Sequence, residues 1–323
     1  MSALAGLLAL VLHLALLIVV APLLTGLVRR LKARMVGRSG PPVTQAWRDL
    51  SRLLRKQPVV AEGTSWLFRA APLVSLAASL AACALVPSFA LGMATAGLSD
   101  LLVIAGLLAL SRAVTALAAM DTGTAFGGIG ASREMAFSTF AEPALLLVVF
   151  TLALLAGTTN LDAIVTLIGS GALGLRVSLA LALAGLSAVA IAETGRVPID
   201  NPATHLELTM VHEAMVLEYS GRYLALIELA ASLRLLLWMS LLAVVFAPFG
   251  IAQSAQSTLL WLPAMAAWLV KILVLAVALA GFEATRAKMR VFRVPEFLGV
   301  ALLLGLLAAI FLFVSQGFAQ GLM

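Results

Sequence analysis

The chain has 323 residues, of which 63% are hydrophobic and only 11% are charged, and its mean hydropathy is +1.11. A water-soluble protein of this size needs more charged surface, so the composition excludes a soluble globular protein and indicates an all-α polytopic membrane protein. The net charge is +6, and the single cysteine, Cys83, cannot supply the ligands of an iron–sulfur cluster or a structural zinc site.

Eight apolar segments are long enough to span a bilayer, since a span needs roughly 20 residues to cross about 30 Å of hydrocarbon. They cover residues 3–28, 70–91, 99–120, 140–158, 175–195, 223–246, 261–281 and 296–317. The apolar segment Leu161–Gly174 is too short to span, and we expect it to lie along the membrane surface. The chain shows no internal repeat and no low-complexity linker, so residues 1–323 are predicted to form a single membrane domain.

Lysine and arginine are distributed unequally between the two sides of this predicted topology. The loops after the first, third, fifth and seventh spans hold ten, one, two and four of the 21 basic residues, and the loops between them hold almost none. Because cytoplasmic loops are enriched in Lys and Arg, we expect these four loops in the cytoplasm and both termini on the outer face. A soluble partner could therefore dock on the cytoplasmic side.

The first cytoplasmic loop contains an amphipathic segment at residues 41–57. Val43, Trp47, Leu50 and Leu54 repeat at helical spacing, and charged residues fill the other positions. Proline residues bound the segment on both sides. We predict an interfacial helix in the headgroup layer, acting either as a basic surface helix or at a portal for lipid or quinone.

Several ionisable residues lie inside the predicted spans, where an unpaired charge costs several kcal/mol. Asp100, Glu283 and Glu296 lie near predicted span ends and are expected to reach the interface. His13, alone in the first span, is expected to be a packed neutral histidine. The remaining residues are predicted to form a hydrated polar path or buried ion pairs: Arg112, Glu142, Glu193, Glu228, Arg234 and Lys271.

An acidic loop at residues 196–222 joins the fifth and sixth spans. Six of the chain's fifteen carboxylates lie between Glu193 and Glu228. A helix is expected from 203 to 219, because an Asn-Pro pair gives a good helix start. On it Glu207 and Glu218 share one stripe, while His205 and His212 share the opposite one and lie about 10 Å apart, too far to bind one metal ion.

Apolar residues alternate with the acids of this loop, so we expect it to pack against protein rather than stand in solvent. Close carboxylates raise one another's pKa, and such groups can exchange protons near neutral pH. The loop is therefore predicted to act as a proton relay or as a charge-coupled switch.

Four segments resemble the membrane subunit that anchors the peripheral arm in the respiratory complex I subunit 1 family. Their sequences are RVPIDNPATHLELTMVHEAMVLEYSG from Arg196, DTGTAFGGIGASREMAFSTFAEP from Asp121, GPPVTQAWRDLSRLL from Gly40, and FEATRAKMRVFRVPEFLG from Phe282. The form of the long loop is most similar to that of the energy-converting group 4 NiFe hydrogenases. The resemblance covers essentially the whole chain and agrees with eight spans.

The resemblance implies a junction between a soluble redox arm and proton-pumping, antiporter-like subunits in the bacterial cytoplasmic membrane. It implies hydrogenase large and small subunits and iron–sulfur subunits as partners, with no nucleic acid. The NiFe centre and iron–sulfur clusters would lie on those partners, and this chain would hold no redox centre or catalytic site. Carried over by motif, the proton-path positions are Glu142, Glu193, Asp200, Glu207, Glu213, Glu218, Glu228 and Lys271. Arg133, in the loop between the third and fourth spans, and Arg196, in the acidic loop, match basic positions of the family, and together with His205 and His212 they are expected to contact partners.

Three alternatives remain open from the sequence. One is the equivalent subunit of a quinone-reducing, complex I-like dehydrogenase, although the stretch NPATHLE differs from the complex I pattern. Another is a free-standing ion transporter, which the long one-sided loops disfavour. The third is a structural anchor, in which neutralising the buried acids would affect assembly alone.

Overall fold

The computed structural model describes residues 2–171, 176–200, 210–253, 258–287, 289–290 and 293–321, and most of these residues are in helices. The two short strands, β1 (Ala90–Leu91) and β2 (Ala252–Gln253), pair in parallel. The helices are α1 (Ser2–Met35), α2 (Gln45–Leu54), α3 (Trp66–Leu85), α4 (Leu101–Asp121), α5 (Ala125–Ala156), α6 (Leu161–Gly169), α7 (Val177–Glu193), α8 (His212–Val216), α9 (Gly221–Phe246), α10 (Trp261–Thr285) and α11 (Val294–Gly321).

Seven helices in the described part of the chain are long and apolar enough to cross a membrane: α1, α3, α4, α5, α9, α10 and α11. The polytopic all-α fold is confirmed: seven of the eight predicted spans form helices of this length, and the eighth forms a shorter apolar helix. The segment predicted at 175–195 forms α7, which has 17 residues and a length of about 26 Å. It stops short because the chain turns at Gly195, whose φ of +57° suits glycine.

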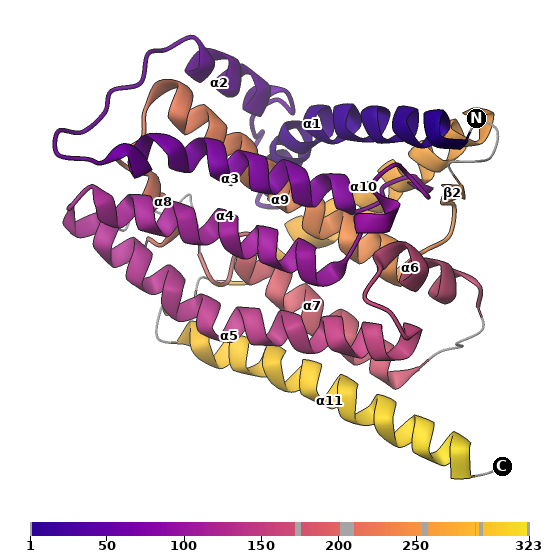
Figure 1. The fold of residues 1–323 in the computed structure, drawn as a ribbon. Helices are drawn as coiled ribbons and strands as arrows, with labels where there is room; N and C mark the ends of the chain where they lie inside the picture. The colour runs from indigo at the N-terminus through magenta and orange to yellow at the C-terminus, as the bar shows by residue number, and fades with distance from the viewer. Residues whose placement is uncertain are drawn as a thin grey trace.

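The long helices run side by side, with the mostly buried α9 in the middle of the bundle (Figure 1). Helix α11 packs on α5 and α7, helix α3 packs on α4 and α9, and α1 packs on α9 and α10. Both termini lie at one end of the bundle, and α2 and α8 lie at the other (Figure 1). We call the end that carries α2 and α8 the loop end, and the opposite one the far end.

Polar contacts at the far end are local and structural. His13 is fully buried, and its ring nitrogens lie 2.7 Å from the Ser88 hydroxyl and 2.8 Å from the Cys83 carbonyl, which agrees with the expected packed histidine. Asp100 does not simply reach the interface as expected. It caps α4 by accepting a hydrogen bond from the Leu102 amide at 2.7 Å.

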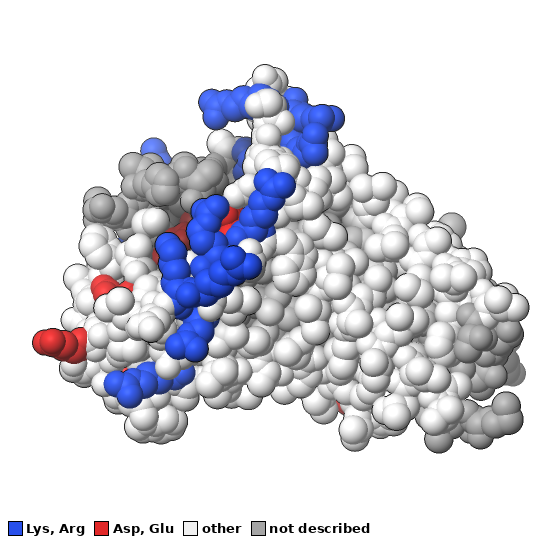
Figure 2. All heavy atoms as spheres, turned by 90° about the horizontal axis from the view of Figure 1, so that it is seen from above, with Lys and Arg blue, Asp and Glu red and all other residues white. Residues whose placement is uncertain are grey.

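Basic side chains gather at the loop end, and the rest of this face is almost free of charge (Figure 2). Helix α2 forms inside the predicted segment 41–57, with Leu50 buried and Trp47 Nε1 donating to the Val19 carbonyl of α1 at 3.1 Å. Its place in the headgroup layer stays a prediction. Leu161–Gly169 forms the short helix α6, whose Leu161, Ile164 and Val165 are buried.

The helix expected at 203–219 is shorter in its described part. Residues 201–209 lie outside the described residues, and from 210 onward the helix covers only His212–Val216. Beyond Val216, two contacts with Phe68 hold Tyr219 outside the helix. The centroids of the two rings are 4.1 Å apart in a stacked arrangement, and the Tyr219 hydroxyl donates to the Phe68 carbonyl at 2.9 Å. These contacts turn the chain into α9.

Candidate functional site

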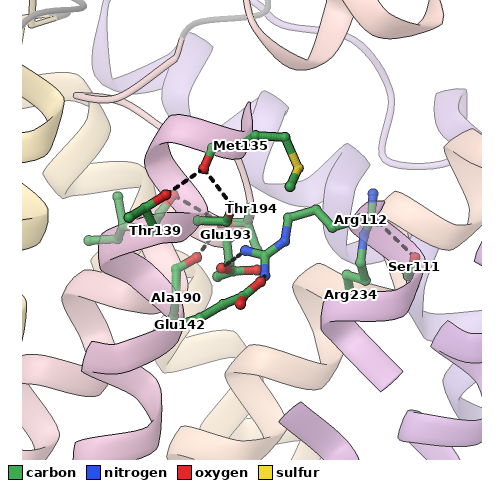
Figure 3. A network of polar contacts seen from close by, with 11 residues as sticks. Ser111, Arg112, Met135, Thr139, Glu142, Ala190, Glu193, Thr194 and Arg234 are labelled. Atoms are coloured by element: carbon green, nitrogen blue, oxygen red, sulfur yellow. Dashed lines mark hydrogen bonds and ion pairs between the residues drawn. The ribbon is translucent and has the colours of Figure 1, made fainter. Parts of the chain in front are cut away.

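A buried arginine joins two carboxylates from different helices in the middle of the bundle. The guanidinium of Arg112, on α4, pairs with Glu193 at the end of α7, and its Nη2 lies 2.7 Å from Oε1 of Glu142 on α5 (Figure 3). The side chains of Arg112 and Glu193 are 12% and 6% exposed, whereas that of Glu142 is 47% exposed. Removing one partner of such a buried pair leaves an uncompensated charge, so these groups hold one another in place.

A second arginine, Arg234 on α9, lies close to this cluster. Its Nη1 donates to the Ser111 hydroxyl at 3.0 Å, and the Ser111 hydroxyl lies 2.8 Å from that of Ser75. Ser111 directly precedes Arg112 on α4, so α4 brings both arginines to the same region (Figure 3). The hydroxyls supply polar partners inside an otherwise apolar bundle.

Arg112, Glu193 and Arg234 line a space of about 60 Å³, which we call the inner cavity. A cavity needs about 10–15 Å³ on this measure to hold a water, so the space is sufficient for a few water molecules. Its titratable lining residues come from α4, α5, α7, α8, α9 and the turn after α7: Arg112, Glu134, Glu193, Asp200, His212 and Arg234.

Glu134 is a member of this site that the sequence analysis missed. We placed residues 121–139 in a loop, whereas α5 already begins at Ala125. Glu134 precedes Phe137, Ala141 and Ala144 on the buried face of that helix at three- to four-residue spacing. Extending the helical periodicity of the fourth span toward its N-terminus would have found it.

A larger cavity of about 630 Å³, which we call the vestibule, lies at the loop end between α1, α9 and the segments around α8. Glu283 of α10 is buried there and forms ion pairs with Lys32 of α1 at 3.2 Å and with Arg196 at 3.6 Å. The expectation that Glu283 reaches the interface is therefore wrong, because two basic groups hold it inside the protein. The charged and titratable residues of the lining are Arg29, Lys32, Arg38, Arg196, Asp200, His212, Glu213, Glu228 and Glu283.

Two side chains hold the described ends of the acidic loop. Arg133 of α5 donates to the Met210 carbonyl at 2.9 Å, and the carboxylate of Asp200 accepts from the Val211 amide at 3.3 Å. Burial lowers the pKa of His212 from 6.5 to about 4, with Arg234 acting in the same direction and Asp200 opposing it. Burial likewise lowers the pKa of Arg196, although Glu283 acts against this.

The other expected site residues are less tightly grouped. Glu228 lines the vestibule and a neighbouring cavity of about 230 Å³ between α1, α2 and α9, and Glu218 is exposed at the loop end. His205 and Glu207 lie outside the described residues. Lys271 of α10 is far from the cluster: it donates to the carbonyl of Ala247 at 2.6 Å and to that of Phe249.

Ala247 is thirteen residues beyond Arg234, which places Lys271 about 20 Å away along the axis of α9. There it satisfies carbonyl groups where α9 ends. In the described part of the chain, no three His, Cys, Asp or Glu side chains gather as metal ligands would. What the inner cavity offers is a set of paired acids and bases around a space large enough for water.

A protein-family model described as NADH dehydrogenase matches residues 7–314, nearly the whole chain. The chain belongs to the NADH dehydrogenase subunit 1 family. The resemblance found in its four motifs is therefore confirmed.

Two curated proteins of Escherichia coli (strain K12) and one solved structure are similar to this family member. Hydrogenase-4 component C is 33% identical over 295 residues, covering 91% of this chain and 92% of that protein. Formate hydrogenlyase subunit 4 is 33% identical over 277 residues, covering 86% and 89%. A chain in the structure of the membrane-bound sulfane sulfur reductase, an archaeal respiratory membrane complex, has the same fold, with a TM-score of 0.79, 19% identity and coverage of 94% and 98%.

Proposed function

We propose that this chain is the membrane subunit that anchors the soluble arm of a hydrogenase-type complex and couples its redox reaction to translocation of protons or sodium ions. The names of the two curated relatives, one from hydrogenase-4 and one from formate hydrogenlyase, support the hydrogenase branch. The family membership supports a junction with further membrane subunits.

One observation carries the coupling part of the proposal. Arg112 pairs with Glu142 and Glu193, which belong to two other helices, beside a cavity that is large enough for a few water molecules. Charges at bilayer depth are costly, and those that persist there mark ion pathways or switches by default. The wall between this inner cavity and the vestibule is made by the turn after α7, by α8 and by α9. If a soluble arm docked at the loop end moves, only the few residues of this wall separate it from the ion pairs of Arg112, so the movement can change their geometry.

The proposal also assigns partners, cofactors and orientation. Hydrogenase large and small subunits and iron–sulfur subunits would dock at the loop end and carry the NiFe centre and the clusters. Antiporter-like subunits would contact the membrane helices. The basic residues at the loop end support a cytoplasmic position for that end by the positive-inside rule. Both termini would then lie on the outer face of the bacterial cytoplasmic membrane.

The test is to purify the tagged full chain in mild detergent, identify the co-purifying proteins by mass spectrometry, and measure nickel and iron. We expect a nickel-bearing hydrogenase pair, iron–sulfur subunits and antiporter-like subunits. A variant with Glu218→Lys at the exposed loop end should lose the soluble arm and keep the membrane subunits. Recovery of a stable chain without partners contradicts the proposal and favours a free-standing transporter.

The vestibule favours one other candidate, the junction subunit of a quinone-reducing complex. Its volume of about 630 Å³ lies in the range of small-molecule sites. A nickel-free arm in the purified complex, together with inhibition of turnover by quinone analogues, would select this function over the first.

A further inference from the structure

The inner cavity and the vestibule share part of their walls. Five residues line both spaces: Thr194, Gly195, Asp200, His212 and Ala231. These residues therefore separate a space of about 60 Å³ at the Arg112 cluster from one of about 630 Å³ at the loop end. A proton that passes directly between the two spaces through their shared lining meets these residues.

Only two residues of the wall can titrate, and they differ in how they are held. Asp200 is 4% exposed, and its carboxylate accepts from the Val211 amide at 3.3 Å, so one oxygen fixes the backbone that leads into α8. His212 is the first residue of α8, and its ring has two nitrogens that can exchange protons in turn. The imidazole can thus take a proton from one side and release another to the opposite side.

Packing of α8 on α5 keeps this imidazole at the wall. The Cα of Gly130 lies so close to α8 that an added Cβ would be 3.0 Å from the Ala214 Cβ and 3.0 Å from the Met215 Cγ. The Arg133 hydrogen bond to the Met210 carbonyl fixes the chain just before α8. Both contacts hold the backbone on either side of His212, and Met215 also lines the inner cavity.

We propose that His212 is the proton-transfer residue between the vestibule and the inner cavity. This inference deepens the proposed function and rests on it. In each transfer one ring nitrogen gains a proton from water or an acid in the vestibule. The other ring nitrogen then loses its proton to water or an acid in the inner cavity, so the imidazole returns to the neutral state as the other tautomer.

The surrounding charges suit a group that holds a proton only briefly. Burial lowers the pKa of His212 to about 4, Arg234 on the inner side also disfavours a lasting positive charge, and Asp200 acts against both. The acids on both sides can supply and accept protons. The charged groups of the two linings are Arg29, Lys32, Arg38, Arg112, Glu134, Glu193, Arg196, Asp200, Glu213, Glu228, Arg234 and Glu283.

The experiment is chemical rescue in the intact complex reconstituted in vesicles, with redox turnover and proton movement followed together. His212→Ala should lower proton-coupled turnover at least about tenfold, the scale of losing a positioned acid–base group. Added imidazole or 4-methylimidazole can enter through the vestibule and should restore the rate several-fold. Across a series of substituted imidazoles, the restored rate should follow the pKa of the added base.

Two further variants separate proton transfer from folding. His212→Gln keeps a polar side chain of similar size and should assemble normally while staying slow and insensitive to imidazole. Met215→Ala, on the same short helix, should lose rate only through packing and should not respond to imidazole. Wild-type-like proton movement in His212→Gln, or a slow His212→Ala complex without rescue, overturns the inference and leaves the proposed function standing. A wild-type complex that moves sodium ions but no protons overturns the inference alone, and a wild-type complex that moves neither ion removes both.

Discussion

Replacing Arg112 tests how the buried cluster stabilises the fold. In Arg112→Met, Glu193 becomes an unpaired carboxylate with 6% of its side chain exposed. Breaking a buried pair in this way costs about 3–5 kcal/mol. Glu142 adds less to this cost, because 47% of its side chain is exposed and it is not confined to the protein interior. The double variant Arg112→Met/Glu193→Gln also removes the charge of Glu193, so the loss should fall to about 1–2 kcal/mol.

The chain contains its own unfolding reporter for this experiment. Cys83 is its single cysteine and is 1% exposed, so a fluorogenic thiol reagent reacts when the bundle opens. The unfolding midpoint of Arg112→Met in detergent should fall by roughly 10 °C, and that of the double variant by much less. Equal losses in the single and double variants would refute the reasoning, since the cost would then come from lost packing and not from an uncompensated charge.

Three further predictions concern the loop end. Gly130→Ala should cost about 1–3 kcal/mol, because the new methyl group overpacks the contact with α8. Tyr219→Phe should cost about 1 kcal/mol, since it removes the hydrogen bond to the Phe68 carbonyl but keeps the stacked ring. Lowering the pH from 6.5 toward 4 should destabilise the wild type more than His212→Gln, because the unfolded imidazole takes up a proton that the folded one does not.

Each of these predictions has a matched control. Gly128→Ala lies on the same helix, where an added Cβ meets nothing within 4 Å, and it should be neutral or slightly stabilising. Tyr223→Phe removes the chain's other tyrosine hydroxyl, and a loss equal to that of Tyr219→Phe would count against the specific hydrogen bond. Parallel pH curves of helix content, measured by circular dichroism for wild type and His212→Gln, would show that the imidazole is not held neutral in the folded state.

The sequence predicts the membrane architecture well because hydropathy and span length are local properties. The sequence predicts helix ends less well, because tertiary contacts determine where a helix begins and ends. The turn at Gly195 shortens α7, and α5 starts fifteen residues before the predicted fourth span, which moves Glu134 from a loop into the bundle. Hydropathy cannot detect that extension, because Arg133 and Glu134 interrupt the apolar run.

Pairing between ionisable residues is also beyond the sequence. Arg112, Glu142 and Glu193 were each candidates for a buried pair or polar path, and the structure brings these three together from three helices. Lys271 was grouped with them by its depth in a span, yet its partners are carbonyl groups near the end of α9. Glu283 was set aside for its position near a span end, yet α1 and Arg196 enclose it. Depth in the membrane is local information, whereas the partner of a charge depends on how the helices pack.

The most direct test of the coupling role is the number of protons moved per electron transferred in the reconstituted complex, compared between wild type and Glu193→Gln. The variant keeps the shape of the Glu193 side chain and a hydrogen-bond acceptor for Arg112, so the complex should assemble and transfer electrons. We predict that the wild type moves protons and that the ratio in Glu193→Gln falls severalfold while electron transfer continues. An unchanged ratio in a fully assembled Glu193→Gln complex would contradict the role of this cluster in coupling.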